Sequence, residues 1–451
     1  MRRLAIIGAL SACLLGDAPF VAMADEKTEQ ALEERIKKLE QMVEALTKHE
    51  AEEAKVKATK EGEKPLSVGS TGSGKLVYAK PFVSAPRATV GGYMDFEMNF
   101  LTDQQLTRSR ATNFDQVRFI PFIYGDVTEH LKVAAEIEFE HGGTNNAKGD
   151  GEIKIEFATV DYLVAEPFNL RAGLLLMPVG KFNLLHDSPL NDLTDRPLVS
   201  RLIIPSTWTE TGVGVYGTFY PGRVSKLDYE LYAFNGFALR AADTAVGVGD
   251  GLRNVRGFQR NDNNNNKGVV GRVAFSPFLG IEVAGSAAHS AYSRNADKYA
   301  TLWAIDWTLQ KGPFEVIGEA AWARIDASGT SGLAPTGMRG YYLQGNYHFL
   351  PNFFKMWAPK HVTEASTFTA VVRWDDVDTD TDDRTLTATG GNTRELQRLT
   401  LGVNFRPVED TVFKLDYQFN TQLNTNHAAT PTGEFGRIDG NGLLLSVATY
   451  F

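Results

Sequence analysis

The stretch that decides the fold stands at the end of the chain and reads Asn441-Gly442-Leu443-Leu444-Leu445-Ser446-Val447-Ala448-Thr449-Tyr450-Phe451. Alternate positions are apolar, namely Leu443, Leu445, Val447 and Phe451. Alternation with a period of two over about ten residues is the pattern of a β-strand that crosses a bilayer, with one face in lipid and the other in water. The alternative is an edge strand that ends a soluble sandwich. We expect the membrane-spanning strand.

The same alternation recurs from Thr89 onward in about sixteen candidate strands. They lie near residues 89–100, 114–124, 131–140, 152–164, 168–176, 211–220, 226–235, 268–275, 280–289, 299–309, 314–325, 339–349, 365–374, 397–406, 411–419 and 442–451. Tight turns such as Pro221-Gly222-Arg223 and Lys311-Gly312-Pro313 occupy every second connection, and longer polar loops occupy the others. This asymmetry is typical of outer-membrane barrels, with short turns in the periplasm. Only the connection from Leu350 to Thr363 is too long for the scheme.

The sequence therefore predicts an all-β fold, a transmembrane antiparallel β-barrel of about 16 strands over residues 87–451. A barrel of that width leaves an aqueous lumen. A β-propeller or β-helix is disfavoured because the sequence shows no fixed internal period. The mean hydropathy of -0.22, with 42 Gly, 27 Phe and 15 Tyr, suits a barrel with lipid outside and water inside. A net charge of -9 argues against a nucleic-acid partner.

The start of the chain has the features of an export signal. Arg2-Arg3 is followed by a mostly apolar segment from Leu4 to Leu15, and Ala22-Met23-Ala24 fits a cleavage site. We predict a signal peptide over residues 1–24. An alternative is a lipoprotein signal at Leu10-Ser11-Ala12-Cys13, which would leave an acylated Cys13. Since Cys13 is the only cysteine, cleavage after Ala24 excludes disulfides and thiol chemistry.

Residues 25–50 form a different kind of segment. Apolar residues there recur at alternating spacings of four and three: Leu32, Ile36, Leu39, Val43 and Leu46. This heptad pattern predicts a periplasmic helix that forms a coiled coil, preferably of two helices. The alternative is a solvated amphipathic helix without a partner. A flexible linker over 51–86 follows. The segment Gly69 to Lys75 fits the start of a P-loop, but Leu76 stands where Ser or Thr is required, so we reject a nucleotide site.

The longest connection without a strand pattern runs from Met177 to Glu210, and such length implies a function. It contains Met177-Pro178-Val179-Gly180-Lys181 and Asp195-Arg196-Pro197, and it leads into Gly212-Val213-Gly214. Here the chain resembles the phosphate-selective porin O and P family. The resemblance implies an outer-membrane trimer that passes small anions and whose third extracellular loop narrows the pore. The terminal Phe451 likewise resembles the assembly signal of bacterial outer-membrane barrels.

Pore-facing charges decide ion selectivity. The candidate constriction residues are Lys181, His186, Asp187, Asp192, Asp195, Arg196 and Arg201. On the strands, inward-facing basic residues predict a basic pore wall of Arg118, Arg373, Arg398 and Lys414. An acidic loop opposite a basic wall would create a transverse field. We therefore expect a weakly selective porin, in which phosphate selectivity is an implication of the resemblance only.

Three alternatives remain for the function. The acidic run Asp375 to Asp383, taken as an extracellular loop, could bind calcium, although solvated carboxylates near lipopolysaccharide fit better and no metal or cofactor is expected. A hydrolase would use His186-Asp187-Ser188, or His289 with Ser286 or Ser290. A structural anchor would use the N-terminal helix to touch the cell wall. We predict a porin of the bacterial outer membrane and no enzyme.

Overall fold

The computed structural model describes residues 87–101, 112–142, 151–237, 251–253, 256, 262, 264–326, 335–382, 395–423 and 441–451. The predicted signal peptide with Cys13, the coiled-coil segment, the linker and the segment Gly69 to Lys75 lie outside these residues. Within the described part of the chain, no helix is long and apolar enough to cross a bilayer.

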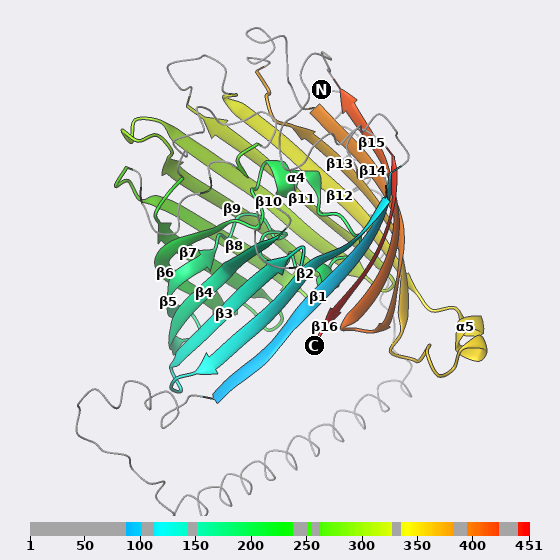
Figure 1. Cartoon of the computed structure of the whole chain (residues 1–451). Coiled ribbons are helices and arrows are strands. Elements are labelled where there is room, and N and C mark those ends of the chain that lie inside the picture. The colour runs from blue at the N-terminus through cyan, green and yellow to red at the C-terminus, as the bar shows by residue number, and fades with distance from the viewer. Residues whose placement is uncertain are drawn as a thin grey trace, which may run out of the picture. The chain divides into compact units, whose positions relative to one another are not determined.

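Sixteen antiparallel strands form a closed barrel in which β1 pairs with β16, as the sequence predicts (Figure 1). The strands are β1 (Arg87–Leu101), β2 (Thr112–Asp126), β3 (Leu131–Glu140), β4 (Glu152–Ala165), β5 (Phe168–Leu176), β6 (Thr209–Phe219), β7 (Lys226–Phe234), β8 (Gly268–Phe278), β9 (Ile281–Ala291), β10 (Tyr299–Lys311), β11 (Phe314–Ile325), β12 (Gly337–Phe349), β13 (Thr367–Asp378), β14 (Glu395–Val408), β15 (Thr411–Leu423) and β16 (Gly442–Tyr450).

The last residue completes the barrel closure. The backbone N–H of Phe451 donates to the carbonyl of Gly92 at 2.9 Å, and the Gly92 N–H donates to the Phe451 carbonyl at 3.1 Å. The Phe451 ring stacks on Phe119 of β2 with centroids 5.6 Å apart. A Cβ on Gly92 would lie 2.3 Å from the carbonyl oxygen of Ile120, so only glycine fits there. Closure leaves no free strand edge.

Side chains alternate between an apolar outer face and a polar lumen. On β8, Val273 and Phe275 are exposed on the outside, whereas Arg272 is buried inside. Its guanidinium pairs with Asp306 of β10. Each strand therefore has one face suited to lipid and one suited to water, which is what a pore through the outer membrane needs.

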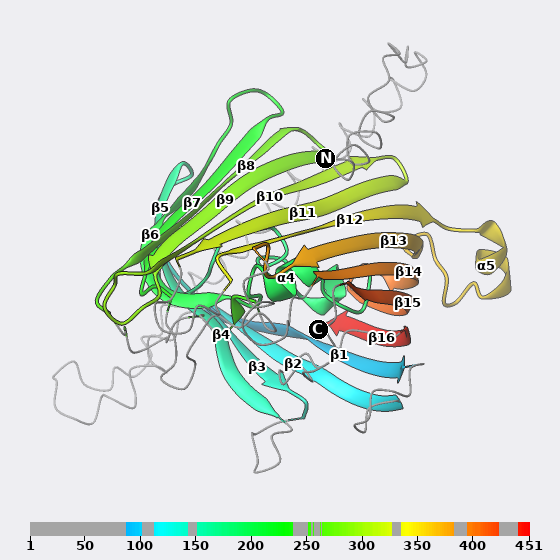
Figure 2. The ribbon, with the colours of Figure 1, turned by 90° about the horizontal axis from the view of Figure 1, so that it is seen from above.

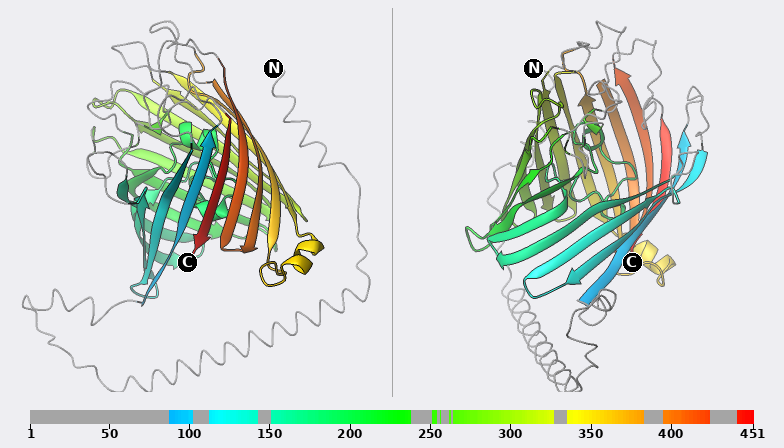
Figure 3. Two further views of the ribbon diagram at one scale, coloured as in Figure 1. Left: turned by 45° about the vertical axis from the view of Figure 1, so that its right-hand side comes forward. Right: turned by 60° about the vertical axis from the view of Figure 1, so that its left-hand side comes forward.

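The long connection between β12 and β13 contains a short helix, α5 (Asn352–Trp357), which the sequence analysis did not predict. It projects past the ends of the neighbouring strands (Figure 3). The Phe354 ring stacks on Phe368 at 4.9 Å, and Phe368 stacks on Phe405 at 4.6 Å. Aromatic stacking of α5 against this rim explains why the connection exceeds a tight turn.

The acidic run was wrongly placed in a loop, because β13 extends through Asp375 and Asp376 to Asp378. Asp375 is fully buried, and its carboxylate lies 3.0 Å from the guanidinium of Arg373. Half of the proposed calcium-binding carboxylates are therefore strand residues, and an intrastrand ion pair occupies Asp375.

Candidate pore constriction

The constriction loop (residues 177–208) connects β5 to β6 and lies inside the barrel. It contains a 3-10 helix, η2 (Ser188–Leu190), and a short helix, α4 (Leu198–Leu202). Seen from above, α4 lies within the ring of strands (Figure 2). It contacts β11, β12 and β13, while η2 contacts β1 and β16. The loop therefore reaches both sides of the barrel closure.

Asn183 holds the two ends of the loop together. Its side-chain amide donates to the carbonyls of Met177 at 2.8 Å and Trp208 at 3.2 Å. Its side-chain oxygen accepts the Trp208 N–H at 2.9 Å. Asn183 is fully buried. These bonds replace the strand ladder at the point where β5 and β6 separate, so that the chain can turn into the lumen.

An apolar cluster fixes the remainder of the loop on one side of the lumen. Trp208 is fully buried, and its ring stacks on Phe237 with centroids 5.1 Å apart. The cluster also contains Leu198, Val199, Leu202, Ile203 and Ile204. A loop with its own apolar core has a definite shape, and it reduces the open cross-section of the pore.

The acidic residues of the loop lie directly on the barrel wall that the sequence analysis placed opposite them. Asp195 is 3.1 Å from Arg398 of β14, and Asp192 is 3.3 Å from Arg406 of the same strand. Lys414 of β15 donates to the Ser188 carbonyl at 2.7 Å. The expectation of a transverse field across the lumen is therefore wrong, because these charges neutralise one another in contact.

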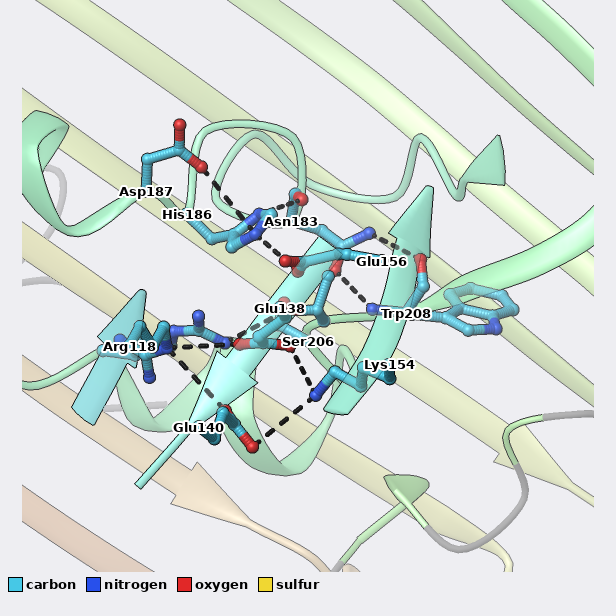
Figure 4. A network of polar contacts seen from close by, with 12 residues as sticks. Arg118, Glu138, Glu140, Lys154, Glu156, Asn183, His186, Asp187, Ser206 and Trp208 are labelled. Atoms are coloured by element: carbon cyan, nitrogen blue, oxygen red, sulfur yellow. Dashed lines mark hydrogen bonds and ion pairs between the residues drawn. The ribbon is translucent and has the colours of Figure 1, made fainter. Parts of the chain in front are cut away.

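The four residues of the predicted basic wall also fall into separate groups. Arg373 lies beside Arg398 and donates to the Asp195 carbonyl at 3.0 Å. Arg118 belongs to another network, 2.9 Å from Asp95 and 3.4 Å from Glu138. Figure 4 shows Arg118 and Lys154 around Glu138 and Glu140.

Arginines gather instead on a two-residue segment of the loop. Arg196 donates to the Thr207 hydroxyl at 3.2 Å, Arg253 to the Ser206 carbonyl at 2.9 Å, and Arg256 to the Thr207 carbonyl at 2.9 Å. The sequence analysis singled out Arg196 but missed Arg253 and Arg256, which stand in the connection between β7 and β8. No local pattern could place that connection beside residue 206.

Arg201 lies near other charged residues of the constriction loop and the barrel wall. Burial lowers the pKa of Arg201 to about 10. Asp195, 4.0 Å away, raises this pKa, whereas Arg398, Arg253 and Arg196 lower it. Like charges lower the pKa of a cation because they disfavour its charged form. Three other arginines therefore lie near Arg201, together with the carboxylate of Asp195.

The beginning of the loop is attached to the other side of the lumen. Lys181 donates to Glu282 of β9 at 3.0 Å and to the Thr308 hydroxyl of β10 at 2.8 Å. The Phe182 N–H donates to Glu319 of β11 at 3.1 Å. The loop therefore spans the lumen between two groups of strands, and Lys181 is one of its anchors.

His186 and Asp187 connect the loop to the strands near the barrel closure. His186 Nε2 lies 2.7 Å from Glu156 Oε1, as Figure 4 shows. Burial lowers the pKa of His186, but the charge of Glu156 raises it more, so the net shift is upward. The Tyr450 hydroxyl donates to Asp187 at 2.9 Å. Neither residue is arranged with Ser188 as a hydrolytic triad.

The second proposed catalytic pair is also wrong. On β9, His289 is on the exposed outer face, whereas Ser286 and Ser290 are buried on the inner face. The His289 ring stacks on Tyr299 at 5.2 Å. The histidine and the serines therefore lie on opposite sides of the barrel wall.

A cavity of about 540 Å³ lies in the lumen beside the loop, and its lining is partly apolar, with Leu175, Leu176 and Leu184. Its lining includes Asp126, Lys132, Asp161, Arg171 and Glu230. Arg171 forms a two-pronged ion pair with Asp161, with both N–O distances at 2.8 Å.

Fold and site together define the class: the protein is a bacterial outer-membrane porin, a closed barrel with a loop folded into its lumen. The family model of the phosphate-selective porins O and P matches residues 91–306 of this chain. A relative from Aquifex aeolicus (strain VF5), an uncharacterized protein, is 28% identical over 310 residues, which cover 65% of this chain and 67% of the relative.

Solved structures share the fold at low sequence identity. The anion-selective porin from Comamonas acidovorans is 12% identical, with a TM-score of 0.50, and the match covers 81% of this chain and 99% of that porin. Salmonella typhi OmpF, solved in complex with daunomycin, is 9% identical with a TM-score of 0.51, covering 82% and 98%. Family and fold indicate a channel for small solutes rather than an enzyme.

Proposed function

We propose that this porin passes small hydrophilic solutes by diffusion and weakly prefers anions, phosphate among them. The observation that carries the preference is the gathering of Arg196, Arg253 and Arg256 on Ser206 and Thr207, beside Arg201. The acidic loop residues Asp192 and Asp195 are in contact with arginines of β14, and Asp195 also lies 4.0 Å from Arg201. Charged side chains at the narrowest part of a pore set its selectivity.

The test is the reversal potential of single channels in a planar bilayer under a KCl gradient. We expect a modest potential of the sign that anion preference gives, together with lower chloride current when phosphate is added. Near-ideal anion selectivity would contradict weak selectivity, and a clear cation preference would contradict the assignment of the arginine cluster to the pore. Zero conductance would favour the structural anchor.

The assembly and the remaining segments belong to the same proposal. A homotrimer is what the family resemblance supports, and the exposed apolar outer face supports contact with outer-membrane lipid and lipopolysaccharide. Residues 1–24 would be removed as a signal peptide, 25–50 would form the periplasmic helix with a contact to the cell wall, and 51–86 would link it to the barrel. Native mass spectrometry of the detergent-solubilised protein reports the oligomer and the mature N-terminus together.

A further inference from the structure

Two buried carboxylates and an imidazole meet where the constriction loop touches β3 and β4. Glu136, Glu156 and His186 each offer one ligand atom, and these atoms lie within 4.8 Å of one another. The three residues are only 2%, 1% and 2% exposed. The loop thus contributes one potential ligand, and the barrel wall contributes two.

A β-bulge brings the two carboxylates to the same face. Glu136 pairs with Phe157 and the next residue, Ile137, pairs with Ile155, so Glu156 is an extra residue on β4. A bulge redirects the side chain of the extra residue. Here it lets Glu156 share the lumen-facing side with Glu136. Bulges are common beside functional sites.

The imidazole is held in the orientation that a metal ligand needs. His186 Nδ1 lies 2.9 Å from the carbonyl oxygen of Asn183, and because a carbonyl only accepts, Nδ1 carries the hydrogen. Nε2 is then directed toward the carboxylates. Metal-binding histidines characteristically donate their second ring N–H to a carbonyl or carboxylate in this way.

Several ligand atoms of the cluster are also buried without a well-placed hydrogen-bond partner. Among the described residues, no hydrogen bond of acceptable geometry reaches Glu136 Oε1, either carboxylate oxygen of Glu156, or His186 Nε2. This holds although His186 Nε2 and Glu156 Oε1 are only 2.7 Å apart. Burial of such groups is unfavourable unless a cation or donor compensates them. The unsatisfied atoms point toward one another.

We propose that Glu136, Glu156 and His186 bind a divalent transition-metal ion of the Zn²⁺ class, which fastens the constriction loop to β3 and β4. On binding, the ion would displace the Nε2 proton of His186, and two carboxylates with a neutral imidazole then balance its charge, so the buried site becomes neutral. Imidazole and carboxylate suit zinc, with bonds of about 2.0–2.2 Å that small side-chain rotations would allow. Calcium is a poor candidate, because it takes about six to eight oxygen ligands.

The test uses the full-length protein in detergent, stripped with a chelator and then dialysed against Zn²⁺ alone. We expect about one ion per chain, and we expect Glu136→Gln and His186→Ala to weaken binding at least about tenfold. The control is Glu140→Gln, which removes a carboxylate of the same strand that lies 3.7 Å from Lys154 and is not part of the cluster. Heat-dependent gel mobility verifies that each variant is a folded barrel.

Zn²⁺ should also raise the Tm of the wild type and of Glu140→Gln, and leave the Tm of Glu136→Gln, an isosteric change, unaltered. Equal binding by all variants, or none by the folded wild type, would overturn the proposal. A loss confined to His186→Ala would also overturn it, because the carboxylates would then not be ligands. Binding requires no ion flow, so failure of the proposed anion preference would leave this result unaffected.

Discussion

Asp195 Oδ2 lies 3.1 Å from the Nη1 atom of Arg398, and this ion pair holds the constriction loop against β14. Gln418 donates to the same carboxylate oxygen at 2.9 Å. The loop therefore owes its position to strand residues more than 200 positions away in the sequence.

Asp195→Asn should loosen the loop. Loss of the charged acceptor leaves Arg398 without its partner in the loop and costs about 2 kcal/mol of docking free energy. We expect larger and noisier single-channel conductance with the barrel intact. Asp410→Asn is the matched control, since Asp410 is an exposed residue of the turn between β14 and β15. Unchanged conductance in Asp195→Asn would show that the loop does not depend on this pair.

Loop docking should resist acid. Burial raises the pKa of Asp195, but Arg398 and Arg201 lower it more, so the folded-state pKa lies below the usual range. A lowered pKa means that the stabilisation is present above the unfolded pKa of about 3.9 and disappears as the pH falls through the folded pKa. We expect the single-channel conductance of the wild type to stay constant from pH 7 to about pH 4.5. A rise within that interval, absent in Asp195→Asn, would contradict this.

The arginine cluster should set the sign of selectivity. Each of Arg196→Gln, Arg253→Gln and Arg256→Gln should lower the anion-to-cation permeability ratio about threefold, since a unit charge about 6 Å from an ion in water contributes about 0.7 kcal/mol. Reversal potentials measure the ratio directly. Arg324→Gln serves as the charge-matched control, because Arg324 is an exposed residue of β11. Equal effects in all four variants would mean that selectivity reflects overall charge alone.

Asn183→Ala should open the base of the loop. It removes three hydrogen bonds and leaves the buried Trp208 N–H unsatisfied, for a loss of about 3 kcal/mol. Limited proteolysis of the purified protein should then cut within residues 177–208 while the barrel stays folded. Resistance equal to that of the wild type would show that the apolar cluster suffices.

Helix α5 should lie at the membrane surface. Trp357 is 81% exposed and Phe353 and Met356 are also exposed, and aromatic side chains favour the interface between lipid and water. Brominated lipids should quench the fluorescence of Trp357. The quenched fraction of the tryptophan fluorescence should therefore be larger in the wild type than in Trp357→Phe. An identical quenched fraction in the two proteins would place α5 in water.

Much of the fold was readable from the sequence, and the reasons are local. The ends of β3, β5 and β11 were predicted to the residue because each strand begins directly after a short turn and ends where the strand pattern stops. The end of β13 was missed because inward carboxylates such as Asp375 look like loop residues in a barrel with a polar interior. Likewise, the bulge at Glu156 leaves no mark in a pattern of apolar residues.

The sequence predicted which segment forms the constriction, but not which strands it lies on. Its length and its polar residues distinguished the loop, but the surface on which it lies depends on contacts over long sequence separations, such as that of Arg406 with the Pro189 carbonyl. Arg253 and Arg256 were missed for the same reason. Which charges face the open pore follows from docking, and docking is not encoded in any single stretch.

The contacts of the constriction loop with the last strand set an order of events during assembly. Asp187 accepts from Tyr450, and the Thr194 hydroxyl lies 2.9 Å from that of Ser446. Neither bond can form until β16 has joined the barrel wall, so the loop makes its full set of contacts only in the closed barrel. Complete docking of the constriction loop thus depends on correct barrel closure, and a barrel that closes incorrectly would conduct more than the native one.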